Sequence, residues 1–291
     1  MIAITSRQNL LYKRLQRLAK GQRNHNISAS LAADIDTTKQ SAIMLEGVHL
    51  GQEWLKYRGQ PWLAIIAIDG MPDADGSINL EAENLPSEIQ EMLVTVAPER
   101  QVAMSRHLLK SLSKIAANQG VLFIAGVAPQ PLPKQINQPT LWLDTVQDPG
   151  NVGTLIRTAA AAGCHEVMLS EGCAHAWMPR VLRASQGAHF ALTIYENVDL
   201  SSMLHRLTIP LYATAVNQQA INLYDMDLRR PCVWLFGNEG VGVTPALLQQ
   251  ATEQIYIPQH EAVESLNVSV AAAICLFEQR RQQTQLKRPA I

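Results

Sequence analysis

The chain has 291 residues, of which 47% are hydrophobic, so it can bury one large core or two smaller ones. Its formal net charge is −1, which counts against a nucleic-acid partner because nucleic-acid-binding domains are usually basic. With no signal peptide and no apolar run that could span a membrane, the sequence predicts a soluble, cytoplasmic protein. The four cysteines form no CxxC pair, and Cys164-His165 with Cys173…His175 matches no common zinc spacing, so free thiols and no metal are expected.

A basic amphipathic helix is predicted over residues 5–23. Leu11, Leu15 and Leu18 form its apolar stripe, and the segment contains no acidic residue. Such a charged face is often only solvated, but in a chain of balanced charge this concentration favours a surface that contacts phosphates. The cations are Arg7, Lys13, Arg14, Arg17, Lys20 and Arg23.

The rest of the first half alternates between strands and helices. A loop is expected over residues 24–40, where Ser, Thr, Ala and Asn predominate. All charges between Asp69 and Glu99 are acidic, which predicts a solvent-facing edge turned away from nucleic acid. A helix is predicted over 48–55, and strands over 43–45, 62–68, 93–97 and 121–125.

Residues 129–139 are proline-rich and polar, and they predict a linker between a domain of residues 1–128 and one of residues 140–291. Beyond the linker, short apolar strands alternate with helical segments, which is typical of a parallel sheet in an α/β domain. Its strands are expected over 141–143, 167–170, 193–195, 211–215, 233–236 and 255–257.

The second domain is organised around residues 141–157, LWLDTVQDPGNVGTLIR. An apolar strand ends in the turn-forming Asp148-Pro149-Gly150, and Asn151 is the expected N-cap of the next helix. Arg157 follows Gly153 by one helical turn, so its guanidinium should pass over a residue without a side chain and reach Asn151. The alternative is a surface arginine on an ordinary strand–helix unit.

Two later stretches also follow a short apolar strand and lead into a helix. A buried strand runs into Gly237-Asn238-Glu239-Gly240-Val241-Gly242, which fits neither GxGxxG nor GxxxxGK[ST], so nucleotide phosphate binding is not predicted. Glycines at the end of a buried strand do let the backbone approach a flat ligand closely. The third stretch, Ser265-Leu266-Asn267-Val268-Ser269-Val270-Ala271, follows a short strand and opens a helix that stays apolar to Phe277.

In this order, the three stretches resemble the signature motifs of the SpoU (TrmH-like) RNA 2′-O-ribose methyltransferases of the SPOUT superfamily, over residues 141–278. The resemblance implies methyl transfer from S-adenosylmethionine to a ribose 2′-hydroxyl of RNA. It also implies that the cofactor is held in a deep trefoil knot of the C-terminal α/β domain. A smaller N-terminal α/β domain that binds RNA, and a homodimer partly formed by residues 268–277, are further expectations.

Ribosomal RNA is the favoured substrate, and transfer RNA is the alternative. A second alternative is a catalytically inactive RNA-binding or assembly protein of the same fold, although the polar residues of all three motifs are present. An α/β hydrolase can be set aside because the chain has no GxSxG nucleophile elbow.

The resemblance also assigns site residues. The catalytic set is Asn151, Arg157, Glu239, Ser265 and Asn267. The S-adenosylmethionine set is Ala215, Asn217, Gly237, Ile257 and Leu266, of which Ile257 and Leu266 could equally be core residues. The RNA set joins Lys13, Arg14 and Arg17 of the basic helix to Arg180 and Arg183, which lie with Ser185 in a further family-like stretch.

The sequence leaves the proton acceptor open. The family's arginine at the position of Arg157 is often described as the base, but an arginine stays protonated under almost all protein conditions. We therefore expect Arg157 to bind a phosphate or ribose oxygen and so lower the cost of deprotonation. Glu239 is the alternative acceptor, unless its carboxylate only binds N–H groups of its own loop.

Overall fold

A computed structural model describes residues 2–20, 40–69, 85–113 and 119–285. The chain divides into two compact units, residues 1–129 with 177–179, and residues 130–176 with 180–291. Most of the loop predicted over residues 24–40 lies outside the described residues, as do Arg23 and the acidic residues of 70–84. None of the described helices has the length and apolar character needed to span a bilayer.

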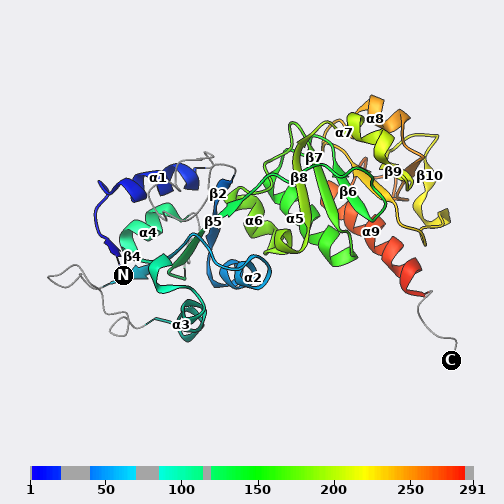
Figure 1. Ribbon diagram of the computed structural model, residues 1–291. Helices are drawn as coiled ribbons and strands as arrows, with labels where there is room; N and C mark the ends of the chain where they lie inside the picture. Colours follow the sequence, from blue (N-terminus) through cyan, green and yellow to red (C-terminus); the bar gives the residue numbers. More distant parts are fainter. Residues whose placement is uncertain (1, 21–39, 70–84, 114–118, 286–291) are drawn as a thin grey trace. The chain divides into compact units, whose positions relative to one another are not determined.

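The first unit is a mixed five-stranded sheet with helices on both faces (Figure 1). α1 (Leu10–Ala19) and α4 (Arg106–Leu112) bury their apolar residues on one face, and α2 (Val48–Arg58) and α3 (Ser87–Val94) cover the other. The strand order is β1 (Ile2–Ile4), β4 (Gln101–Ser105), β3 (Leu63–Ile68), β5 (Val121–Val127) and β2 (Ser41–Glu46), with a short 3-10 turn η2 (Pro98–Arg100) before β4.

The strand predicted over residues 93–97 is wrong. Residues 87–94 form α3, which follows Pro86 and buries Ile89, Met92 and Leu93 at helical spacing. The strand of this region is β4, which pairs in parallel with both β1 and β3. The three- and four-residue spacing of Ile89 with Met92 and Leu93 indicates a helix. The strand prediction considered only the apolar residues from 93 onward and so missed this helical period.

Asn9 fixes the start of α1 five residues later than predicted. Its side chain accepts hydrogen bonds from the backbone N–H groups of Leu11 (2.9 Å) and Tyr12, which satisfies two donors of the first helical turn. Tyr12, Leu15 and Leu18 are buried against the sheet, so the basic residues of α1 occupy its outer side.

The second unit is built on a seven-stranded parallel sheet, which confirms the predicted α/β fold class. Each of its six predicted strands is present, and β10 is an addition. The trefoil knot stays a prediction. The strand order is β10 (Ile221–Asn222), β12 (Glu253–Tyr256), β9 (Leu211–Thr214), β11 (Val233–Phe236), β6 (Thr140–Leu143), β7 (Glu166–Ser170) and β8 (Thr193–Val198).

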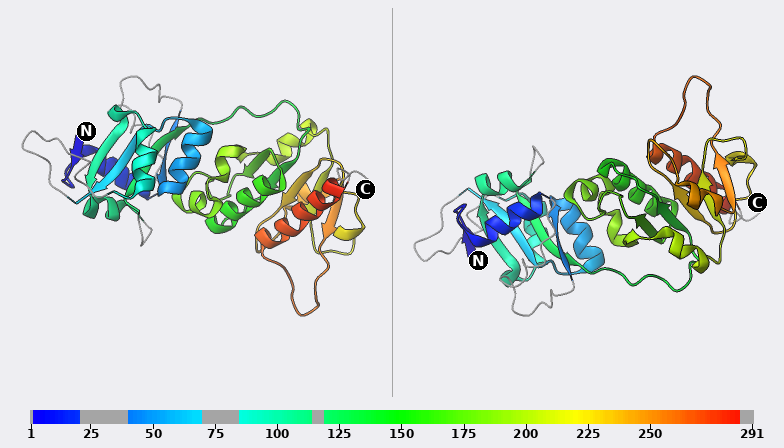
Figure 2. Two further views of the ribbon diagram at one scale, coloured as in Figure 1. Left: turned by 90° about the horizontal axis from the view of Figure 1, so that it is seen from below. Right: turned by 90° about the horizontal axis from the view of Figure 1, so that it is seen from above.

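Two long helices, α5 (Pro149–Ala162) and α9 (Val268–Gln285), pack against each other, and Figure 2 shows α9 in red beside the sheet. The Trp234 indole N–H donates to Gln279 Oε1 (2.9 Å), which fixes α9 to the central strand β11. The shorter elements are α6 (Pro179–Ser185), η3 (Ala188–Ala191), α7 (Leu200–Met203), η4 (Leu204–Arg206), η5 (Leu223–Asp225) and α8 (Pro245–Gln249).

Candidate functional site

Three adjacent parallel strands, β12, β9 and β11, end at the same edge of the sheet of the second unit. Ala213 pairs with Leu235, and Thr214 pairs with Ile255, so Ala215, Gly237 and Ile257 all follow directly at this edge. Carboxyl ends of parallel strands are where α/β domains bind ligands. Three of the predicted cofactor residues are therefore brought to one edge by the topology alone.

Asn151 joins the three sequence motifs. Its side-chain N–H donates to Glu239 Oε1 (2.8 Å), and its Oδ1 accepts from Asn267 Nδ2 (3.1 Å) and from Ser269 Oγ (3.2 Å). Because the Asn151 side-chain oxygen accepts these two bonds, the Asn151 side-chain nitrogen is on the side of Glu239. Three of the predicted catalytic residues thus form one hydrogen-bonded cluster, with Ser269 as a fourth member that the predicted set does not include.

The Asn151 side chain is available for this cluster because Asn151 is not the N-cap of α5. The prediction of Asn151 as the N-cap is therefore wrong. The N-cap is Asp148, whose Oδ1 accepts from the backbone N–H groups of Gly150 (2.7 Å) and Asn151 (3.0 Å). Pro149 then occupies the first helical position, where a missing N–H costs nothing. The Asp-Pro-Gly triplet therefore begins the helix instead of forming a separate turn before it.

α9 begins with a similar cap. Asn267 Oδ1 accepts from the backbone N–H groups of Ser269 (2.9 Å) and Val270 (3.4 Å), while its Nδ2 reaches Asn151. Asn267 therefore both caps α9 and takes part in the cluster at Asn151. Ser265 lies two residues earlier, and its exposed side chain makes no hydrogen bond to any residue that the structure describes.

The predicted path of Arg157 over Gly153 is closed. A Cβ added at Gly153 would lie 2.5 Å from Ala184 Cβ and 2.6 Å from the Val181 carbonyl oxygen, because α6 packs directly on this position. Gly153 therefore serves helix packing. Arg157 is exposed, and it has no side-chain hydrogen bond or ion pair with any residue of the described ranges.

The loop after β11 turns back on its own start. A Cβ at Gly237 would lie 2.1 Å from backbone atoms of Gly242 and Val243, and the Asn238 N–H and C=O both bond to Gly242 (3.0 and 2.9 Å). The loop's own backbone thus requires glycine at 237, and the part of Gly237 in cofactor binding stays a prediction. Gly242 completes the turn with a φ of +75°.

This loop is fastened to the end of β6 at two points. The buried Asp144 carboxylate accepts from the Thr244 N–H (2.8 Å), and Asn238 Nδ2 donates to the Thr145 carbonyl (2.9 Å). Thr145 has a φ of +54°, which for a β-branched residue costs on the order of 1–3 kcal/mol. Sequence reasoning did not find Asp144, Thr145 or Asn238. Only Asn238, in a glycine-rich turn, carried a sequence signal.

Each of the three strand-end loops carries an exposed valine. Val216, Val241 and Val263 lie in the loops after β9, β11 and β12, and their exposed fractions are 77%, 83% and 51%. Exposed valines on three loops that leave one sheet edge, beside backbone groups, fit a flat and partly apolar ligand. Figure 2 shows the orange-brown loop before α9 extending away from the sheet.

The cofactor candidates differ in exposure and in their hydrogen bonds. Leu266 and Ile257 are half-buried, and Ala215 bonds through its N–H to the Ile255 carbonyl (3.0 Å). Asn217 is exposed; its Nδ2 donates to Gln254 Oε1 (2.8 Å), and its Oδ1 accepts from the Gln219 N–H. Its side chain therefore shapes its own loop.

The predicted RNA residues lie in both units. Lys13 and Arg17 are exposed on α1, and Arg14 is half-buried. On α6, Arg180 is exposed and forms an ion pair with Asp148 (3.5 Å), while Arg183 is half-buried.

Ser185, which was also expected to face RNA, is fully buried. Its hydroxyl lies 2.6 Å from His189 Nδ1, and His189 Nε2 lies 2.7 Å from the Ala176 carbonyl. Burial lowers the pKa of His189 to about 4, so the ring is neutral and donates through Nε2. This pair is part of the core under α6.

The cysteines are free thiols, and burial raises the pKa of Cys164 to about 12. No group of three or more His, Cys, Asp or Glu side chains within the described ranges is arranged to hold a metal ion.

Comparison with known proteins places this site in a family. Residues 138–277 match the model of the SpoU rRNA methylase family. The chain is also 31% identical over 248 residues to the 23S rRNA (guanosine(2553)-2′-O)-methyltransferase RlmP of Bacillus subtilis, covering 84% of this chain and 91% of RlmP. The chain belongs to the SpoU family. This membership confirms the predictions of an RNA methyltransferase and of S-adenosylmethionine as its methyl donor.

Two further relatives show how far the similarity extends. An uncharacterised tRNA/rRNA methyltransferase of Synechocystis is 40% identical over 152 residues, which are 51% of this chain and 55% of that protein. The crystal structure of an AdoMet-bound rRNA methyltransferase from Sinorhizobium meliloti has the same fold, with a TM-score of 0.75 at 23% identity, over 96% of this SpoU chain and 97% of that one.

Proposed function

We propose that this SpoU protein transfers the methyl group of S-adenosylmethionine to a ribose 2′-hydroxyl of ribosomal RNA. The observation that carries the proposal is the Asn151 cluster, because it brings a carboxylate and three polar groups from separate motifs to one place beside the strand ends. The name of RlmP, a 23S rRNA 2′-O-methyltransferase, supports a ribosomal substrate.

Glu239 is the proton acceptor in this proposal. Bound S-adenosylmethionine supplies a methyl group on a positively charged sulfur, and the 2′-hydroxyl must lose its proton as it attacks. Glu239 is exposed, and Asn151 holds one of its oxygens, so the other oxygen can face a hydroxyl. A carboxylate within hydrogen-bond reach of the proton meets the geometric requirement for a general base.

Arg157 keeps the role of electrostatic organiser. It lies six residues after Asn151 on α5, about 9 Å further along the helix axis. Because no described group of the protein pairs with it, its five N–H donors can serve an RNA phosphate or ribose oxygen.

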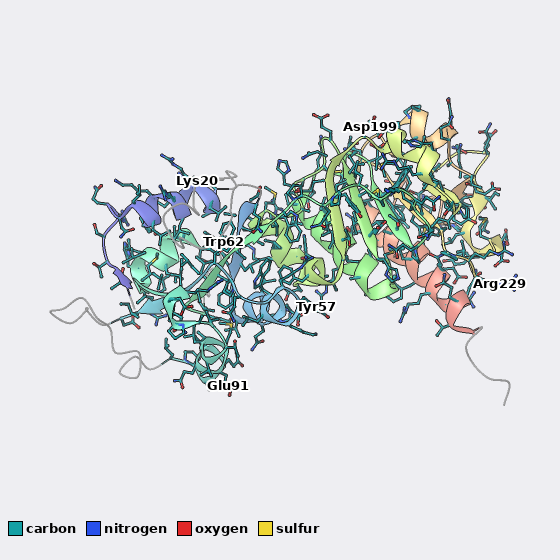
Figure 3. The ribbon with its side chains drawn as sticks, in the orientation of Figure 1. Lys20, Tyr57, Trp62, Glu91, Asp199 and Arg229 are labelled. Atoms are coloured by element: carbon teal, nitrogen blue, oxygen red, sulfur yellow. The ribbon has the colours of Figure 1, made fainter. Side chains whose placement is uncertain are left out.

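The first unit provides a surface for RNA on the layer formed by α1 and α4. Neither helix contains an acidic residue, whereas α2 and α3 on the other face carry Glu53, Glu88 and Glu91. Figure 3 shows Lys20, just after α1, and Glu91 on opposite sides of this sheet. A polyanion is attracted more strongly to the first layer than to the mixed charges of the second, where α2 also carries Lys56 and Arg58. The cations of the first layer are Lys13, Arg14, Arg17, Lys20, Arg106 and Lys110, of which Arg106 pairs with Asp69.

Changing Lys13 and Arg17 together to Gln should weaken RNA binding and flatten its salt dependence. Each lost phosphate contact lowers the slope of log K against log salt by about 0.7 to 0.9. Lys56→Gln on α2 is the matched control, because it removes one exposed cation from the opposite layer. Equal slopes for the double variant and the wild type, measured by filter binding at several salt concentrations, would show that the α1–α4 layer is only solvated.

A homodimer is part of the proposal. Val270 and Phe277, seven residues apart and so on one side of α9, are 48% and 47% exposed, and Ile274 between them is half-buried. An apolar stripe of this kind suits a second copy of the chain. Sedimentation velocity should give twice the mass of one chain, and a monomer across the micromolar range would contradict it.

The function is tested by incubating the protein and S-adenosylmethionine with ribosomal and transfer RNA from a strain that lacks its gene. Mapping of 2′-O-methyl groups should reveal one or few new sites in ribosomal RNA. Methylation of transfer RNA alone would show that transfer RNA, and not ribosomal RNA, is the substrate. Binding without methylation of either RNA would indicate an inactive assembly protein.

A further inference from the structure

We propose that Asn238 and Thr145 form a clamp that directs the Glu239 carboxylate, which makes both of them positioning residues for methyl transfer. The inference rests on the proposed role of Glu239 as proton acceptor. It begins from the position of Glu239, which is exposed and whose side chain has a hydrogen bond to Asn151 at 2.8 Å. An exposed carboxylate keeps one direction only if the backbone that bears it is fixed.

Asn238 fixes that backbone from within. Its Oδ1 accepts from the N–H groups of Gly240 (2.8 Å) and Val241 (3.2 Å), and its own N–H and C=O bond to Gly242. These four bonds wrap the loop around Asn238, with Glu239 as the next residue. An asparagine side chain placed this way imitates a backbone turn.

One further bond of Asn238 leaves the loop. Its Nδ2 donates to the carbonyl of Thr145 (2.9 Å), at the end of β6. That carbonyl has its direction because Thr145 adopts a φ of +54°, and the Thr145 N–H is held by Ser170 Oγ (2.9 Å) at the end of β7. Backbone in this region of φ is retained where surrounding groups enforce it, and such residues cluster at functional sites.

The far end of the loop is fixed by Asp144, the residue that directly follows β6. The Asp144 carboxylate accepts from the Thr244 N–H (2.8 Å), and the Asp144 N–H donates to the Phe236 carbonyl (2.9 Å). Glu239 is thus carried by a loop with both ends tied to Asp144 and Thr145. Because Asn151, in the first turn of α5, follows only a few residues later, the end of β6 sets the positions of both Glu239 and its partner.

A double-mutant cycle tests whether Asn238 acts through Glu239. At saturating S-adenosylmethionine and RNA, Asn238→Ala should lower the single-turnover rate by roughly a hundredfold, the effect of a displacement of about 1 Å at a reacting group. In a Glu239→Gln background the same change should cost less than about threefold, because no carboxylate is left to misdirect. Equal losses in the two backgrounds would show that Asn238 only supports the fold, and would leave the proposed function intact. Wild-type activity of Glu239→Gln would instead remove the proposed role of Glu239 as proton acceptor, on which this inference rests.

Two variants separate the clamp from the shape of the loop. Asn238→Asp keeps an acceptor for Gly240 and Val241 but sets a carboxylate against the Thr145 carbonyl, so it should be as slow as Asn238→Ala. Thr145→Gly keeps the carbonyl and adopts a positive φ without strain, so it should retain the rate within about threefold. Asn222→Ala, which removes a similar turn-forming side chain at the end of β10, is the matched control and should be as active as the wild type. Unfolding of both Asn238 variants, or a normal rate for Asn238→Asp, would overturn the clamp.

Discussion

Replacing Glu239 with Gln should lower the single-turnover rate of methyl transfer by a factor of roughly 10² to 10⁴, the usual contribution of a general base. Gln keeps an oxygen that can accept from Asn151 and nearly the same shape, so the hydrogen-bonded cluster should persist. What it loses is the capacity to take up the hydroxyl proton. The affinity for S-adenosylmethionine, measured by calorimetry, should change little.

Glu261→Gln is the matched control, because Glu261 is also an exposed carboxylate in a loop after a strand of the same edge. It should leave the rate unchanged. Retention of more than a tenth of the wild-type rate by Glu239→Gln would exclude Glu239 as the proton acceptor. The search for the acceptor would then turn to the RNA or to water.

Arg157→Ala should cost roughly a hundred- to a thousandfold in rate, the typical loss of one well-placed electrostatic contact. Because Arg157 has no partner within the described residues, the change should leave the midpoint of thermal unfolding where it is, and the defect can be attributed to substrate. Arg157→Lys keeps the charge without the planar fork and should retain part of the activity.

A proton-accepting arginine would behave differently in this series. Lysine loses its proton more readily than arginine, so Arg157→Lys would then regain activity steeply as the pH rises. Single-turnover rates of both variants across a pH series distinguish the two roles. Full recovery of the lysine variant at alkaline pH would contradict the organiser role.

The parallel sheet could be predicted from sequence because buried parallel strands are short apolar runs closed by turn residues. The strand predicted over 233–236 coincides with β11, and the glycine expected at its end, Gly237, follows it directly. The failure at 93–97 has the opposite cause, since an apolar run that belongs partly to a helix was read without its period.

The site was less predictable, for local reasons. A good N-cap residue at 151 was available, but Asp148 followed by Pro149 is a better start, and this choice releases the Asn151 side chain. The positive φ of Thr145 has no sequence signal, because a β-branched residue is among the least expected there. Gly153 and Gly237 were recognised as necessary glycines, but their neighbours turned out to be α6 and the loop's own backbone.

Asn151 contacts residues of both other motifs, and this limits which substitutions the three motifs can accept independently. Residues 151, 239 and 267 are far apart along the chain, yet their side chains meet at one amide, which donates to Glu239 and accepts from Asn267. A substitution in one motif therefore changes what the other two can tolerate, and their effects should not be additive. A chimera that takes α9 from one relative and β6 with α5 from another should lose activity even if both parents are active, unless the polar contacts at Asn151 are exchanged together.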